Sequence, residues 1–108
     1  MKSYSVRWTN AAEQDLESTV SFVADEDLRR AQRVLDRIEH RAESLRKYPL
    51  RVRVVPELRW HGITSYRQLV EKPWRIVYRV DGSRVWVHAV IDGRRSLEDL
   101  LLERFLRM

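Results

Sequence analysis

The sequence has no cysteine, only three glycines and three prolines, and no long apolar run. Without cysteine there is no disulfide framework and no thiolate zinc site. So few glycines leave no glycine-rich loop for cradling phosphates. No stretch approaches the roughly 18 apolar residues of a membrane helix, and no N-terminal run resembles a signal peptide. We therefore expect one cytoplasmic domain over residues 1–108, with no membrane segment, no cofactor and no metal.

Charge is abundant and unevenly distributed along the chain. There are 21 Lys and Arg residues against 16 Asp and Glu, which gives a net charge of +5. Residues 9–40 carry eight acidic and four basic residues, whereas residues 41–84 carry eleven basic and four acidic ones. A localised basic surface is typical of proteins that bind nucleic acid or an acidic protein. The alternative is a solvated surface that only keeps a small protein soluble.

Apolar spacing in the first half predicts a strand followed by a helical hairpin. Residues 4–8 alternate polar and apolar as a strand does, and Thr9 or Asn10 is the expected N-cap of the next helix. A second helix with an apolar stripe begins after the acidic turn at 25–27 and ends near Pro49. Two amphipathic helices joined by so short a link form an antiparallel hairpin.

The second half predicts a three-stranded meander over residues 66–95, with a tight turn at Asp81-Gly82. Residues 48–64 are predicted as a loop that is functional or contains a hidden element. A last leucine-rich helix follows the meander. The fold class is α+β in the order β-α-α-β-β-β-α, a small, mainly antiparallel sheet with the helical hairpin on one face. The apolar strand residues expected to face the hairpin are Trp74, Ile76, Tyr78, Val80, Val85, Val87, Ala89 and Ile91.

The other sheet face, the strand ends and the preceding loop are rich in arginine. His88 is the one histidine expected on this polar face, so it is the candidate acid or base if the chain cleaves RNA. The competing interpretation is a half-buried histidine that is hydrogen-bonded to a neighbour. The candidates for binding an anionic target are Arg51, Arg53, Arg67, Arg75, Arg79, Arg94 and Arg95.

The order of elements and several short strings resemble the RelE/ParE superfamily of bacterial toxins. The strings are VRWT at residues 6–9, VPEL at 55–58, WRIVYR at 74–79 and VIDGRR at 90–95. The resemblance covers nearly the whole chain. It implies the toxin of a type II toxin–antitoxin (plasmid stabilisation) module, neutralised by a cognate antitoxin protein.

The superfamily contains two activities, and the resemblance leaves both open. RelE-like members cut messenger RNA on the ribosome; in that case Arg75 and Arg94 or Arg95 would contact the phosphate, with His88 as acid or base. ParE-like members inhibit DNA gyrase without being enzymes. Many RelE-like toxins carry a C-terminal tyrosine, but this chain has none after Tyr78. That departure favours the ParE-like branch; the alternatives are a ribosome-dependent endoribonuclease and an inactive antitoxin-binding module.

The last helix carries more apolar residues than one narrow stripe needs. One interpretation is that it docks on its own sheet, and the other is that an antitoxin helix fills an exposed groove or face of it; both hold if the antitoxin covers only the outer edge. The predicted antitoxin contacts are Leu97, Leu101 and Phe105.

Overall fold

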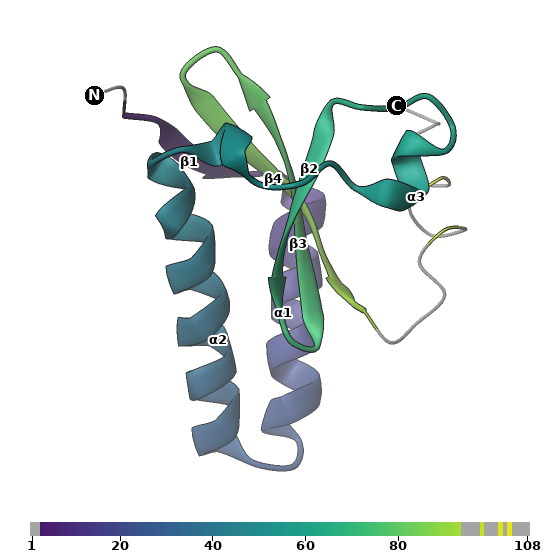
Figure 1. Ribbon diagram of the computed structural model, residues 1–108. Helices are drawn as coiled ribbons and strands as arrows, with labels where there is room; N and C mark the ends of the chain where they lie inside the picture. The colour runs from purple at the N-terminus through teal and green to yellow at the C-terminus, as the bar shows by residue number, and fades with distance from the viewer. Residues whose placement is uncertain (1–2, 94–97, 99–101, 103, 105–108) are drawn as a thin grey trace.

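The computed structural model describes residues 3–93 together with Glu98, Leu102 and Arg104, and its elements follow the predicted order (Figure 1). The hairpin of α1 and α2 covers one face of the sheet, so the predicted α+β class is confirmed. The three described C-terminal residues are helical. The elements are β1 (Ser5–Trp8), α1 (Asn10–Ala24), α2 (Leu28–Glu43), η1 (Ser44–Arg46), η2 (Pro49–Arg51), α3 (Pro56–Arg59), β2 (Tyr66–Glu71), β3 (Trp74–Asp81) and β4 (Arg84–Asp92).

Side-chain caps begin both long helices. Of the two predicted caps for α1 it is Thr9 that acts, because its Oγ1 accepts a hydrogen bond from the Ala12 amide at 3.1 Å. For α2, a carboxylate oxygen of Asp27 accepts from the amides of Arg29 and Arg30 at 3.0 and 3.1 Å. Such caps satisfy amides that the first turn leaves without partners, and each contributes about 1 kcal/mol. Within the described part of the chain, neither these helices nor any other is long and apolar enough to cross a membrane.

The strands form one sheet in the order β1-β4-β3-β2. β1 runs parallel to β4, while β2, β3 and β4 pair antiparallel as the meander requires. Asp81 pairs with Arg84 across the turn between β3 and β4. Gly82 lies in that turn at φ +60°, in the left-handed region that glycine adopts without a steric cost. The predicted turn at Asp81-Gly82 is therefore confirmed.

A β-bulge in β4 changes which of its side chains face the helices. The register shift lies between Val77 and Tyr78 of β3, and it makes His88 an extra residue in β4. The predicted apolar face through Val85, Val87, Ala89 and Ile91 is therefore wrong, because one inserted residue reverses the alternation of a strand. The residues of β4 that pack toward the hairpin are Val85, Val87 and Val90, and those on the opposite face are Ala89 and Ile91.

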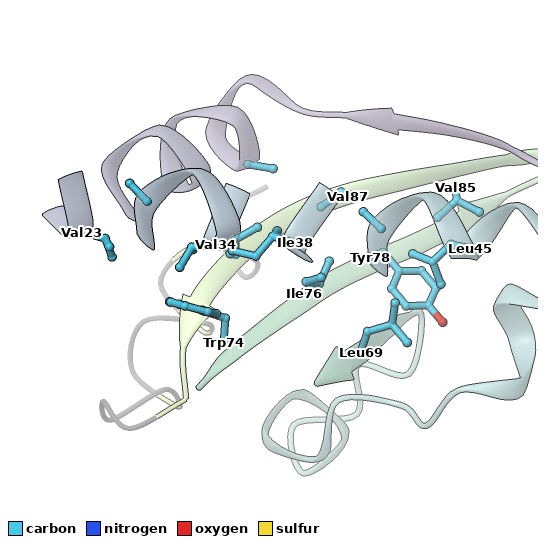
Figure 2. Close-up of a cluster of buried hydrophobic side chains, with 14 residues drawn as sticks. Val23, Val34, Ile38, Leu45, Leu69, Trp74, Ile76, Tyr78, Val85 and Val87 are labelled. Carbon is cyan, nitrogen blue, oxygen red and sulfur yellow. The ribbon is translucent and has the colours of Figure 1, made fainter. Parts of the chain in front are cut away.

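The main core lies between the hairpin and the sheet (Figure 2). Trp74, Ile76 and Tyr78 of β3 point inward, as predicted, and meet side chains of α2 such as Ile38. The hydroxyl of Tyr78 donates to the Pro49 carbonyl oxygen at 2.5 Å, so the buried ring keeps a partner for its polar end. Burial raises the pKa of Tyr78 to about 12, since the phenolate would lose its hydration.

Residues 47–65, here called the strap, pass round the outer edge of β2 from one sheet face to the other. On the way Val54 forms an isolated antiparallel bridge with Arg67, whose Nη1 donates to the Val52 carbonyl oxygen at 2.6 Å. Beyond the bridge lies α3, the hidden element within the predicted loop, and it buries Leu58 against the far face. The strap therefore covers part of the face that the sequence pattern left open. This second core consists of Val55, Leu58, Tyr66, Val77, Ala89 and Ile91.

Candidate functional site

Arg75 lies at the centre of a polar cluster on the sheet face opposite the hairpin. Its Nη1 lies 2.8 Å from each carboxylate oxygen of Glu57 and 3.1 Å from Oε1 of Gln68. Glu57 belongs to α3 and Gln68 to the neighbouring strand β2, so the strap and the sheet together position the guanidinium. Both side chains of the ion pair are 22% exposed. Because the pair is partly buried, solvent and salt screen it less than a pair on the open surface.

Two opposing effects act on the charge of Glu57. Burial would raise the pKa of this carboxyl, but the hydrogen bond from Arg75, with help from its own backbone amide and nearby Arg53, holds the pKa below its ordinary value. Glu57 is therefore ionised at neutral pH and compensates the charge of Arg75. One nitrogen of the guanidinium, Nη1 of Arg75, is thus occupied by Glu57 and Gln68.

The end of β4 comes close to the same arginine. The Gly93 amide donates to the Pro73 carbonyl oxygen at 2.7 Å. A Cβ at Gly93 would lie 3.0 Å from that oxygen and 3.7 Å from Cγ of Arg75, so a larger residue would have to displace backbone. The roles predicted for residues beyond this point stay predictions. The candidates that lie outside the described residues are Arg94, Arg95, Leu97, Leu101 and Phe105.

A hollow beside the Arg75–Glu57 pair is formed by α3 and the turn that follows it. Its volume is about 480 Å³, and it is lined by Pro56, Glu57, Trp60, His61 and Glu98. His61 Nε2 lies 3.1 Å from Oε1 of Glu98, which joins the strap to the C-terminal segment. Sequence reasoning missed Glu57, His61 and Glu98. The one available signal was the VPEL string, which marks Glu57 without indicating its partner.

His88 is buried at the bulge and is not displayed for catalysis. It is 7% exposed, and its ring meets that of Tyr66 edge to face with centroids 5.3 Å apart. Burial, and then the positive charge of Arg79, lower the pKa of His88, so the imidazole is neutral at pH 7. These surroundings favour the structural interpretation of His88 over a role as acid or base.

The described arginines that were predicted to bind an anionic target lie on three separate parts of the molecule. Arg75 and Arg79 lie on the face opposite the hairpin, where Arg75 meets Glu57 and Arg79 pairs across strands with a residue of the second core. Arg67 lies on the hairpin side of edge strand β2, in the same cross-strand pair as Tyr78. Arg51 and Arg53 are exposed on the strap. These described arginines therefore do not form one continuous surface.

Asp15 joins three segments at the open end of β4. Its Oδ2 accepts from the Val90 amide at 3.0 Å and from Nη1 of Arg104 at 2.6 Å, and Nη2 of Arg104 lies 3.2 Å from Oδ1. β1 ends at Trp8, so Asp15 supplies the acceptor that a longer strand would have supplied. Leu102, two residues before Arg104, packs on the second core. The carboxylate thus ties α1, the bulged strand and the C-terminal segment together.

A second hollow, here called the hairpin groove, has a volume of about 470 Å³ and lies along α1 and α2 next to β1. Its acidic rim contrasts with the arginine-rich strap. The groove is lined by the apolar residues Trp8, Leu16, Val20 and Leu35 and by Glu13, Glu17, Ser21 and Glu39. Among the described residues, no group of three or more His, Asp or Glu side chains is placed to hold a metal ion.

Comparisons with known proteins identify a family for the chain and structures that share its fold. A family model described as the ParE toxin of the type II toxin–antitoxin system parDE matches residues 6–97. No curated protein matches the chain. A solved structure of the chromosomal ParDE system from P. aeruginosa shares the fold, with a TM-score of 0.68 and 20% identity, covering 82% of this chain and 95% of that chain. The RelBE2 toxin–antitoxin complex from Mycobacterium tuberculosis is also similar, with a TM-score of 0.59 and 24% identity, covering 83% of this chain and 98% of that chain.

Proposed function

Because the chain belongs to the ParE toxin family of type II toxin–antitoxin systems, we propose that it inhibits DNA gyrase by binding to it and that a cognate antitoxin neutralises it. The observation that carries the proposal is the family match over residues 6–97. The two similar structures are of toxin–antitoxin systems, and this supports an antitoxin as partner.

The surroundings of the candidate catalytic residues support binding over cleavage. Cleavage of RNA through its 2′-hydroxyl needs a base, an acid and a cation that can meet the phosphorane charge. Arg75 is compensated by Glu57, and His88 is buried and neutral. A toxin that acts by binding needs an accessible surface, which the strap and the hairpin groove both offer.

The direct test is a supercoiling assay with the purified chain and DNA gyrase. We expect inhibition that increases with toxin concentration and disappears when the antitoxin encoded beside the toxin is added first. The toxin–antitoxin mixture is the matched control, because it contains the same toxin preparation. No inhibition at any reachable concentration would reject the proposal.

Ribosome-dependent RNA cleavage is a second candidate, since Arg75 borders a hollow that contains His61 and two carboxylates. Primer extension on translated messages would then show codon-linked cuts that disappear in Arg75→Ala. Intact messages during growth arrest would remove this candidate. An inactive antitoxin-binding module is distinguished from both by induction without antitoxin, because that module alone leaves growth unchanged.

Two surfaces are candidates for the antitoxin. The first is the C-terminal segment with the predicted contacts Leu97, Leu101 and Phe105. The second is the hairpin groove, whose apolar floor suits one face of an amphipathic helix and whose glutamates suit basic residues beside that face. Pull-down of the antitoxin by Leu16→Glu toxin tests the groove, and undiminished capture would exclude it.

A further inference from the structure

Trp60, directly after α3, is the most exposed of the large apolar side chains in the described part of the chain, at 87%. Its position is held firmly. Leu58 is fully buried in the second core, and the amides of His61 and Ile63 both donate to the Leu58 carbonyl oxygen at 3.0 Å. Gly62, at φ +77°, completes the turn in a conformation that suits glycine. The backbone that carries the indole is therefore hydrogen-bonded to a residue of the second core.

Two hollows on the protein surface are lined in part by Trp60. One is the hollow of about 480 Å³ that contains Glu57 and His61, and the other, of about 450 Å³, is lined by Pro56, Arg59 and Trp60. An exposed tryptophan beside such hollows is the kind of residue that dominates protein interfaces, because burying its ring removes a large apolar area from water.

The strap around Trp60 is mainly positively charged. Residues 47–65 contain four basic residues and one acidic residue. Arg51, Arg53 and Arg59 are exposed and form no ion pair with the other described residues. The single acid, Glu57, is already compensated by Arg75. The charge of this surface is complementary to an acidic partner, which would also be attracted to it over a distance.

A protein suits this surface better than a nucleic acid. A base stacked on Trp60 would bring its phosphates next to the exposed carboxylate of Glu98, which lines the adjoining hollow. A protein can place carboxylates against the arginines and an apolar cleft against the indole without that repulsion. The surface is also separate from the hairpin groove, because α3 packs on the sheet face opposite the hairpin.

We infer that the strap, with Trp60 as its anchor, is the surface that contacts the toxin's target, through an acidic patch of the target protein with a cleft that accepts the indole. This inference rests on the proposed function, since the target is the protein that the toxin inhibits.

The test compares full-length Trp60→Ala with full-length Phe22→Ala in the gyrase supercoiling assay. Phe22 is the matched control, because it is also an exposed aromatic residue, at 73%, but lies on α1. We expect Trp60→Ala to need about tenfold more toxin or higher for half-inhibition, and Phe22→Ala to stay within about twofold of wild type. Both variants should melt like the wild type and bind the antitoxin equally well.

Two double charge-reversal variants test the contribution of the strap arginines to inhibition in the same assay. Arg53→Glu/Arg59→Glu should inhibit weakly and with little dependence on salt, whereas the control Arg29→Glu/Arg33→Glu on α2 should inhibit like the wild type. Failure of the wild-type toxin to inhibit gyrase would reject the proposed function. Wild-type inhibition that Trp60→Ala retains in full would overturn this inference alone. Loss of antitoxin binding, or of binding to a labelled single-stranded oligonucleotide, in Trp60→Ala would also overturn it.

Discussion

The ion pair between Glu57 and Arg75 should contribute measurably to stability, and its geometry sets the magnitude. Removing one partner of a fully buried pair costs about 3–5 kcal/mol, whereas exposed pairs contribute less than about 1 kcal/mol. At 22% exposure for each side chain, we expect about 2 kcal/mol for Arg75→Met, which leaves Glu57 and Gln68 without their donor. Glu57→Gln should cost about 1 kcal/mol, because the amide oxygen can still accept from Arg75.

The assay is a double-mutant cycle in which urea and thermal unfolding at pH 7 are monitored by circular dichroism. For a domain of this size each kcal/mol corresponds to a fall in Tm of roughly 4 °C. The coupling free energy between the two substitutions should be about 1 kcal/mol. A matched control is the exposed pair of Glu43 and Arg46, whose side chains are 52% and 53% exposed. Its cycle, built from Glu43→Gln and Arg46→Met, should show a coupling close to zero.

The pH dependence provides a second check on the same pair. Since the pKa of Glu57 in the folded protein lies below its ordinary value of 4.5, its contribution to stability is fully present above about pH 4.5 and is lost as the pH falls through the lowered pKa. The difference in stability between wild type and Glu57→Gln should therefore shrink in acid. If the two substitutions of the cycle are additive within about 0.5 kcal/mol, as in the control, the ion pair does not stabilise the fold and the reasoning is refuted.

Three further predictions concern buried or half-buried polar groups. Asp15→Ala removes the acceptor of the Val90 amide and should lower the free energy of unfolding in urea by about 2 kcal/mol, with Asp15→Asn in between. Tyr78→Phe loses the hydrogen bond to the Pro49 carbonyl and should cost about 1 kcal/mol in the same measurement. The pKa of His88 lies below its ordinary 6.5, so stability should fall as the pH drops below 6.5, and His88→Gln should remove that part of the slope in melting curves from pH 7.5 to 5. A slope unchanged in His88→Gln would show that other groups cause it.

Local patterns predicted the elements that depend on neighbours in the chain. Thr9 and Asp27 cap helices because their side chains reach amides two or three residues ahead. Gly82 forms its turn because no other residue accepts that backbone conformation as readily. Trp74 points inward because the alternation of β3 is unbroken around it. In each case the determining contacts lie within a few residues, where the sequence can be interpreted directly.

The candidate site was less predictable, because its contacts join distant segments. The sequence indicated Arg75 as a site residue but not its partner Glu57, 18 residues earlier. Glu57 lies on α3, a short helix within residues 48–64, which were predicted as a loop. The sequence placed His88 on the polar sheet face, either as an acid or base or as a half-buried residue, and could not show the bulge at which the side chain is buried. A bulge depends on how two strands align over their whole length, so the spacing of apolar residues within one strand does not predict it.

The sequence by itself determined the α+β class, the order of the elements and the membership of the chain in a toxin family, since these follow from periodicity, caps, turns and short strings. Among the described residues, only the tertiary structure decided which arginines are paired with a carboxylate and which are exposed. Packing of α3 on the sheet neutralises Arg75 and leaves Trp60 and the strap arginines exposed. The physical reason is that charge compensation and burial are properties of segments brought together by the fold, and their separation along the chain does not reveal them.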